Sequence, residues 1–181
     1  MIVAREKRKK NIVEYILYMW QVEDLIRALD FDLQKIKDTL IAQYQTDEEQ
    51  EKEVVAWYSN LVLMMQKEQL RETGHMQILI NLTNDLNRFH EALLRQHIDA
   101  EYSRLYADIK DDLVLVRQKS GRNHHDIEVA LNTLYLILML KMKNQDISEG
   151  TQKAVWKFGN FMGHLSELFK SYESGDLELA Y

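Results

Sequence analysis

Apolar residues recur every three or four positions along most of the chain, and this spacing predicts a series of amphipathic helices. One long helix is predicted to start near Asp99 and to stop at Gly121. Its apolar stripe consists of Tyr102, Leu105, Tyr106, Ile109, Leu113 and Val116. A last helix is predicted to follow a cap at Ser148, with the stripe Val155, Phe158, Phe161, Met162, Leu165, Phe169 and Tyr172.

Four further helices are predicted before these two. A first helix is predicted over about residues 5–28, and a second after a cap at Asp30 or Asp32. A third is predicted from Thr46, with Gly74 ending it or breaking the chain before a fourth. The fourth helix carries the stripe Ile78, Leu79, Leu82, Leu86, Phe89 and Leu93.

Residues 127–142 form the most apolar stretch, with apolar side chains on nearly every side of a helical wheel. A helix of this kind is buried by its neighbours. The sequence therefore predicts an all-α fold, a single-domain bundle of about seven helices around a buried central helix at residues 127–143, capped by Asn123. The two ends, residues 1–8 and 174–181, are expected to fray.

The amino-acid composition supports the all-α class and excludes several classes of function. The chain has no proline, which would break helices, and no cysteine, which excludes disulfides and thiol chemistry and fits a reducing cytosol. A net charge of −6 gives no overall attraction to nucleic acid. The longest apolar run, residues 134–140, is too short to span a bilayer. We expect a cytoplasmic protein that is neither exported nor membrane-bound.

Basic residues gather only near the start, at Arg5 and over residues 7–10. The simpler interpretation is a solvated first turn. Nucleic-acid binding is the alternative, and it usually needs a basic face that continues elsewhere.

The first helix places charges on its apolar face. On a helical wheel, Glu23 falls about 20° and Arg27 about 60° from Ile12, in the middle of that face, and Asp24 lies at its edge. Because charged groups are rarely buried without partners, Glu23 and Arg27, four residues apart, are expected to form a buried structural ion pair. A polar pocket for an anionic or amide-bearing ligand is the alternative.

His75 is the second candidate residue. It stands in line with the apolar stripe of the fourth helix, where it can meet Glu23 or Asp24 in the core. A core histidine with one hydrogen-bond partner is the simpler interpretation. The alternative is a ligand site or active site built from Glu23, Asp24, Arg27 and His75.

The sequence gives little support for a metal site or for nucleophilic catalysis. A di-iron bundle uses paired Glu-x-x-His motifs, and the one such spacing here, from Glu72 to His75, contains Gly74. No G-x-S-x-G motif or phosphate-binding glycine loop is present. We therefore expect no metal and no cofactor, and an enzymatic role is not favoured.

The chain resembles an uncharacterised family of small bacterial helical proteins, a domain of unknown function. The most specific segments are 1–4, 6–8, 14–15 and 17–28, and weaker ones are 74–77, 100–102 and 132–135. The resemblance covers nearly the whole chain and implies a stand-alone cytoplasmic protein. It implies no reaction, ligand or catalytic residue.

The leading hypothesis is a protein that acts through contacts with other proteins or with itself. Tyr15, Tyr18 and Trp156 lie outside the main stripes, and exposed aromatic residues are enriched at interfaces. Gly159 and Gly163, four residues apart, allow close approach of a second helix. That helix belongs to the same bundle in the simpler interpretation and to a second copy in the alternative, a homodimer.

Overall fold

The computed structural model describes residues 2–44, 47–121 and 124–180. Within these residues it contains helices and no strand, which confirms the predicted all-α class. The helices are α1 (Ile2–Lys10), α2 (Ile12–Ala28), α3 (Leu33–Thr39), a short 3-10 helix η1 (Ile41–Gln43), α4 (Glu48–Lys67), α5 (Gln77–Gln96), α6 (Ala100–Ser120), α7 (Asp126–Met142) and α8 (Glu149–Ser174).

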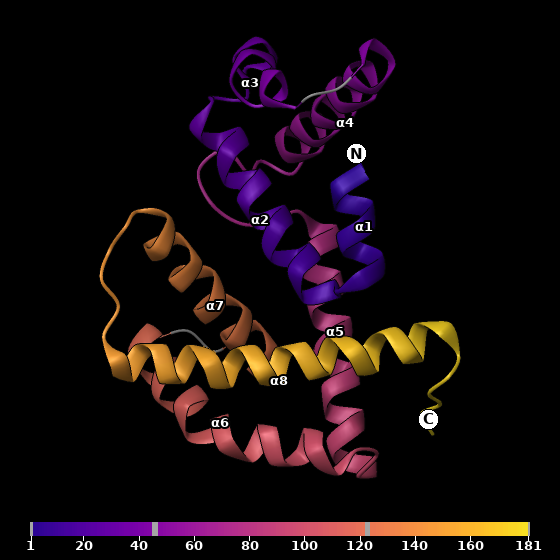
Figure 1. The fold of residues 1–181 in the computed structure, drawn as a ribbon, viewed down its shortest axis with the longest axis vertical. Helices are drawn as coiled ribbons and strands as arrows, with labels where there is room; N and C mark the ends of the chain where they lie inside the picture. Colours follow the sequence, from indigo (N-terminus) through magenta and orange to yellow (C-terminus); the bar gives the residue numbers. More distant parts are fainter. Residues whose placement is uncertain (1, 45–46, 122–123, 181) are drawn as a thin grey trace.

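Helix α2 links two parts of an elongated molecule (Figure 1). At one end of the long axis, α3 and α4 pack against each other; toward the other end, α5, α6 and α7 surround α8. Helix α8 contacts α2, α5, α6 and α7, with its most extensive contact on α6. Its buried residues include Phe158, Phe161, Met162 and Leu165. The helix at the centre of the bundle is therefore α8.

Helix α7 was predicted to be buried on all sides, and this is wrong for its second half. The first half is buried, with Ile127, Ala130 and Leu131 inaccessible to solvent. In the second half, Leu136 is 60% and Met142 is 62% exposed. Exposure to water is unfavourable on every side of a helix that has apolar side chains on every side. This pattern does not show that this chain supplies the covering surface.

The predicted first helix is two helices that meet at Asn11. Asn11 has an extended backbone, and its side chain accepts a hydrogen bond from the backbone N–H of Glu14 (2.9 Å), so it caps α2. Asparagine competes with helical backbone bonds through its own side chain, which favours caps over helix interiors. This break accounts for eight α-helices in the described residues, where about seven were predicted.

Most of the other predicted boundaries are confirmed. Asp32, Asp99 and Ser148 cap α3, α6 and α8. Gly121 ends α6 in the left-handed conformation. Two predicted caps, Thr46 and Asn123, lie outside the described residues; Asp47 and His125 cap α4 and α7.

Gly74 does not end a helix. Helix α4 ends at Lys67, and Gly74 lies in the loop of residues 68–76 that leads to α5. Its φ of 97° is a conformation that side chains with a Cβ rarely adopt. This loop, and not the start of α5, carries His75.

Both ends of the chain make contacts. Ala4 of α1 is buried, and the Arg8 guanidinium donates to both carboxylate oxygens of Glu173 (2.6 and 2.8 Å). In the tail, Gln96 exchanges two hydrogen bonds with the backbone of Ala180 (2.7 and 2.9 Å). Fraying of these ends stays a prediction.

A polar network joins α5, α6 and α7. His90 is buried, and its Nδ1 lies 2.7 Å from the hydroxyl of Tyr102. The Tyr106 hydroxyl donates to Asp126 (2.7 Å), and the Arg117 guanidinium also binds this carboxylate. The neighbouring His90 (Nε2 to Oδ2, 3.9 Å) and the hydrogen bonds from Tyr106 and Arg117 hold the pKa of Asp126 well below its usual range, although partial burial opposes the shift.

Within the described residues, no helix is both long and apolar enough to cross a membrane.

The lowered pKa of Asp126 predicts acid sensitivity. Its carboxylate stabilises the fold fully above the pKa of an unfolded aspartate, about 3.9, and this stabilisation is lost as the pH falls through the lower folded-state value. At neutral pH we expect Asp126→Asn to lower the free energy of unfolding by about 1.5–3 kcal/mol. In urea unfolding, the difference from the wild type should shrink below about pH 4. A difference that stays constant into strong acid would contradict this prediction.

Candidate functional sites

Glu23 is completely buried in α2, and both of its carboxylate oxygens have partners. Oε2 lies 2.6 Å from His75 Nδ1, and Oε1 accepts a hydrogen bond from the backbone N–H of Met76 (2.7 Å). The predicted contact between His75 and Glu23 is confirmed. The predicted ion pair between Glu23 and Arg27 is wrong, because the loop of residues 68–76 takes the place of Arg27.

Arg27 binds a different set of groups. Its guanidinium pairs with Asp24 (2.8 Å) and donates to the backbone carbonyls of Leu70 (3.0 Å) and Gly74. The other oxygen of Asp24 accepts a hydrogen bond from the Tyr135 hydroxyl of α7 (2.5 Å). Burial raises the pKa of Tyr135, and the bond to Asp24 adds to the effect. Glu23 and Arg27 together hold the loop against α2, and this is the structural role of the charges on the apolar face.

His75 stands at the edge of this network. Its ring stacks on Trp20 with centroids 4.2 Å apart and planes inclined by 13°. The side chain is 31% exposed. Nδ1 is engaged by Glu23, and within the described residues Nε2 has no hydrogen-bond partner. His75 therefore presents one ring nitrogen to its surroundings while the other is held.

A small pocket of about 40 Å³ opens beside His75. Trp20, Leu79, Ile80, Thr83, Asn84 and Glu128 complete its wall. Asn84 Oδ1 lies 3.2 Å from His125 Nε2, and Glu128 Oε2 lies 2.8 Å from His124 Nδ1. Of the four predicted site residues, only His75 lines this pocket; Glu23 lies behind it, and Asp24 and Arg27 hold the loop.

Sequence reasoning missed Asn84 and Glu128. Glu128 belongs to the narrow polar strip of the otherwise apolar α7, which was a usable signal. Asn84 carries no comparable signal, because polar residues on the exposed side of α5 look alike in the sequence. In the described residues, no group of three or more His, Cys, Asp or Glu side chains is placed to hold a metal ion.

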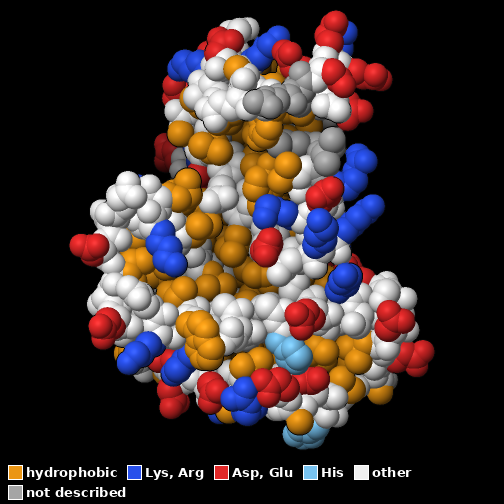
Figure 2. Space-filling view, viewed as in Figure 1, with side chains coloured by type: hydrophobic (Ala, Val, Ile, Leu, Met, Phe, Trp, Pro, Cys, Tyr) orange, Lys and Arg blue, Asp and Glu red, His pale blue; other side chains and the backbone are white. Residues whose placement is uncertain are grey.

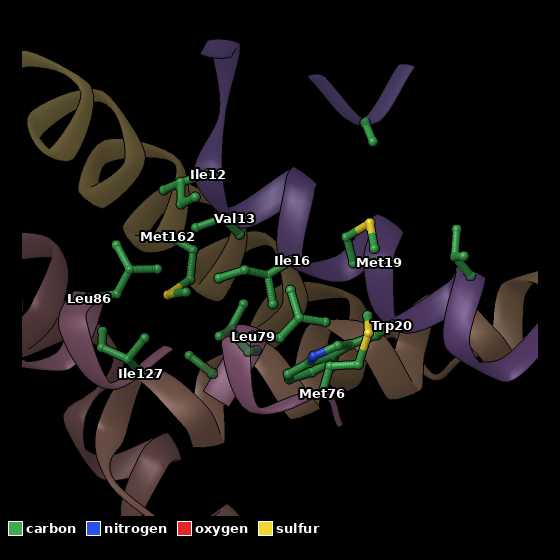
Figure 3. Packing of buried hydrophobic residues seen from close by; sticks show 14 of the residues in the cluster. Ile12, Val13, Ile16, Met19, Trp20, Met76, Leu79, Leu86, Ile127 and Met162 are labelled. Atoms are coloured by element: carbon green, nitrogen blue, oxygen red, sulfur yellow. The ribbon is translucent and has the colours of Figure 1, made fainter. Parts of the chain in front are cut away.

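Trp20 is the apolar centre of the site. It is almost fully buried, and Figure 3 shows its indole beside Met76 and Leu79. The edge of Tyr135 meets its face at a centroid distance of 5.5 Å. Its buried Nε1 has no hydrogen-bond partner among the described residues. The ring thus connects the Glu23–His75 pair to α7 by packing alone.

A second candidate site is the exposed apolar surface that α7 and α8 share, defined by Leu136, Met142 and Trp156 and called here the α7–α8 face. Trp156 is 70% exposed, the highest value among the large apolar side chains. Figure 2 shows apolar side chains gathered over the α7 region and in the hollow between α7 and α2. The predicted exposure of aromatic residues is confirmed for Trp156, whereas Tyr15 and Tyr18 pack partly buried against the core.

Two grooves border this face, one on each side of α7. A groove of about 460 Å³ is lined by residues that include Tyr135, Leu136 and Met139. Another, of about 590 Å³, is lined by residues that include Ile137, Val155 and Trp156. The face therefore combines protruding apolar side chains with apolar depressions next to them.

Gly159 and Gly163 do not mark a close helix contact within the bundle. A Cβ atom at either position would find nothing within 4 Å outside its own helical backbone. The simpler interpretation of these glycines is therefore wrong. Both lie on the same side of α8 as Trp156, because residues 156, 159 and 163 are three and four positions apart.

Comparison with known protein families gives a match over most of the chain. The model of a family described as Domain of unknown function (DUF4924) matches residues 1–176. No curated protein sequence and no solved structure matches the chain.

Proposed function

The protein belongs to the DUF4924 family of unknown function, and on that premise we propose that it acts through protein contacts, by pairing with a second copy of itself through the α7–α8 face. The observation that carries the proposal is the set of large exposed apolar side chains Leu136, Met142 and Trp156. Large apolar side chains that a monomer leaves exposed can mark interaction sites.

A second copy is the occupant that the face suits, because a two-fold contact requires one surface to complement itself. The protruding Trp156 and the groove beside it lie on the same face. Lys141 and Asp146 both line that groove, so a two-fold axis allows Lys141 of one copy to meet Asp146 of the other. In the proposed dimer this pair gives the two surfaces complementary charges.

The glycines of α8 extend this surface. Gly159 is exposed and Gly163 partly exposed, and neither has a neighbour that would exclude a side chain. Small residues four apart allow the backbone of a second helix to approach closely. In the proposed dimer they provide the flat part of the surface beside the protruding Trp156.

Trp156→Glu is expected to abolish this association. A buried interface tryptophan typically contributes about 2 kcal/mol or more, so the dissociation constant should rise by roughly 30-fold or more. Sedimentation velocity over a concentration series should show a dimer that forms with concentration in the wild type and a monomer in the variant. Because Trp156 is exposed in the single chain, the thermal unfolding temperature of the variant monomer should change little.

Leu63→Glu is the matched control. Leu63 lies on α4, away from the α7–α8 face, and is 53% exposed. This variant should associate like the wild type. A wild type that stays monomeric at every concentration, or a Trp156→Glu variant that still dimerises, would refute the proposal.

The proposal includes a cytoplasmic location and a bacterial source. The absence of cysteine supports the location, because a reducing compartment supplies no disulfides. Nucleic-acid binding by the basic start is not part of the proposal, since Arg8 pairs with Glu173 and Lys7 with Glu14. No catalytic activity is included either.

A further inference from the structure

We infer that the pocket beside His75 binds the ammonium group of a primary alkylamine, between His75 Nε2 and the carboxylate of Glu128. This is a binding site of its own, independent of self-association through the α7–α8 face. The hydrogen-bonding state of His75, the charges around the pocket and the size of the pocket all favour such a guest.

In its neutral form, His75 offers a hydrogen-bond acceptor to the pocket. The Glu23 carboxylate has only acceptor oxygens, so the short contact of 2.6 Å requires the proton to lie on His75 Nδ1. In the neutral ring, Nε2 then carries the lone pair. Stacking on Trp20 and the bond to Glu23 fix the ring plane and its rotation. This is the arrangement by which a buried carboxylate orients a histidine for a partner at its second nitrogen.

Glu128 provides the second acceptor. One of its oxygens binds His124, and the other has no partner among the described residues. The neighbouring His125 accepts the backbone N–H of Glu128 at Nδ1 (3.1 Å), so its Nε2–H points to Asn84 Oδ1. Burial lowers the pKa of His125, which keeps this ring neutral. His125 therefore does not compensate the charge of Glu128.

The electrostatic balance favours a cation. No lysine or arginine is among the described residues that line the pocket. One carboxylate, Glu128, lines it, and a second, Glu23, lies directly behind His75. A guest with several N–H donors and a positive charge satisfies both acceptors, whereas an anion would meet two negative charges.

The pocket volume restricts the guest to a small head group. A cavity needs roughly 10–15 Å³ by the same measure to hold one water molecule, so about 40 Å³ leaves room for a group of the size of an ammonium head. Ile80 lines the pocket and is 40% exposed, so an aliphatic stem can lie against it on the way to solvent. The ligand class is a primary alkylamine, supplied by a free amine or by a lysine side chain of a peptide.

The test is a titration of protein carrying ¹⁵N-labelled histidine, followed by NMR, with butylammonium chloride as the probe. Butyltrimethylammonium chloride at equal ionic strength is the control, because it carries the charge without an N–H donor. We expect a saturable shift of His75 Nε2 with the primary amine alone, and no comparable shift at His97 or His164. Equal shifts from both salts, or no saturable shift, would overturn the inference.

Two variants separate the inferred site from alternatives. Glu128→Gln should weaken butylammonium binding by about tenfold or more, and Asn84→Asp should strengthen it, because the local negative charge falls in one and rises in the other. If the pocket bound anions instead, sodium acetate would bind more tightly to Glu128→Gln and more weakly to Asn84→Asp than to the wild type. That result would refute the inference. Trp156→Glu should bind butylammonium like the wild type, so the outcome does not depend on dimer formation.

The source of the amine is resolved by a competing titration. A short peptide with one lysine and blocked ends is compared with butylammonium in the same assay. Tighter binding of the peptide assigns the pocket to protein lysines, and equal or weaker binding assigns it to free amines. Binding of neither probe would overturn the inference.

Discussion

Replacing Glu23 with alanine is expected to lower the free energy of unfolding by about 3–5 kcal/mol, the range measured when one member of a buried polar pair is removed. The substitution leaves His75 Nδ1 and the backbone N–H of Met76 without an acceptor in a dry environment. It also releases the loop of residues 68–76 from α2. Urea unfolding of the variant and the wild type measures the effect.

Glu14→Ala is the matched control on the same helix. Glu14 is 58% exposed, and its pairing with Lys7 is a surface ion pair that contributes about 0–1 kcal/mol. The two substitutions remove the same chemical group from α2. Similar losses in both variants would show that Glu23 is not the buried anchor of the loop.

Phe161→Ala should have an effect of similar size, about 3–5 kcal/mol, because it empties a well-packed aromatic site. Phe161 is completely buried on α8. Its ring lies against Tyr102 and Tyr106 of α6 and His90 of α5, with centroids 5.1, 5.9 and 5.7 Å away. Differential scanning calorimetry or urea unfolding tests the loss.

Trp156→Ala provides the comparison on α8 itself. Trp156 is larger than Phe161 but is 70% exposed in the single chain. Measured at a concentration where the protein is monomeric, this variant should change the unfolding free energy by less than about 1 kcal/mol. If Trp156 proved as important as Phe161 to the monomer, its exposed position on α8 would be wrong.

Much of the fold could be predicted because helix faces and caps are local properties. Asp99, Gly121 and Ser148 mark helix ends by chemistry that acts within one turn. The break at Asn11 was missed because residues 5–10 are all charged, so no apolar stripe precedes Asn11 whose change of direction could show the break. Periodicity detects which side of a helix is apolar, and it does not detect a change of direction between two helices.

The candidate site was found, and the contact between His75 and Glu23 was among the predicted possibilities, but the pairing of Arg27 was not predicted correctly. A charge on an apolar face identifies Glu23 from the first helix alone. Its partner His75 lies 52 residues away, and the choice between it and Arg27 depends on how a loop packs. Long-range placement of this kind leaves no trace in local spacing.

The exposed half of α7 shows a similar limit. Leu136 and Met142 read as core residues because their apolar character is indistinguishable from that of Leu131. Hydrophobicity reports a preference for a dry environment, and that environment can come from this chain or from a second one. In the proposed dimer, a second copy of the chain supplies this dry environment.

Engineered cysteines test this central claim most directly, because the chain has no cysteine of its own. Leu136→Cys, Met142→Cys and Trp156→Cys are made one at a time and oxidised at a concentration where the wild type associates. A disulfide requires Cα atoms within about 7 Å, so only positions near a two-fold axis can form one. The account predicts a covalent dimer for at least one of the three and none for Leu63→Cys. Cross-linking at Leu63 alone, or at none of the face positions, would contradict it.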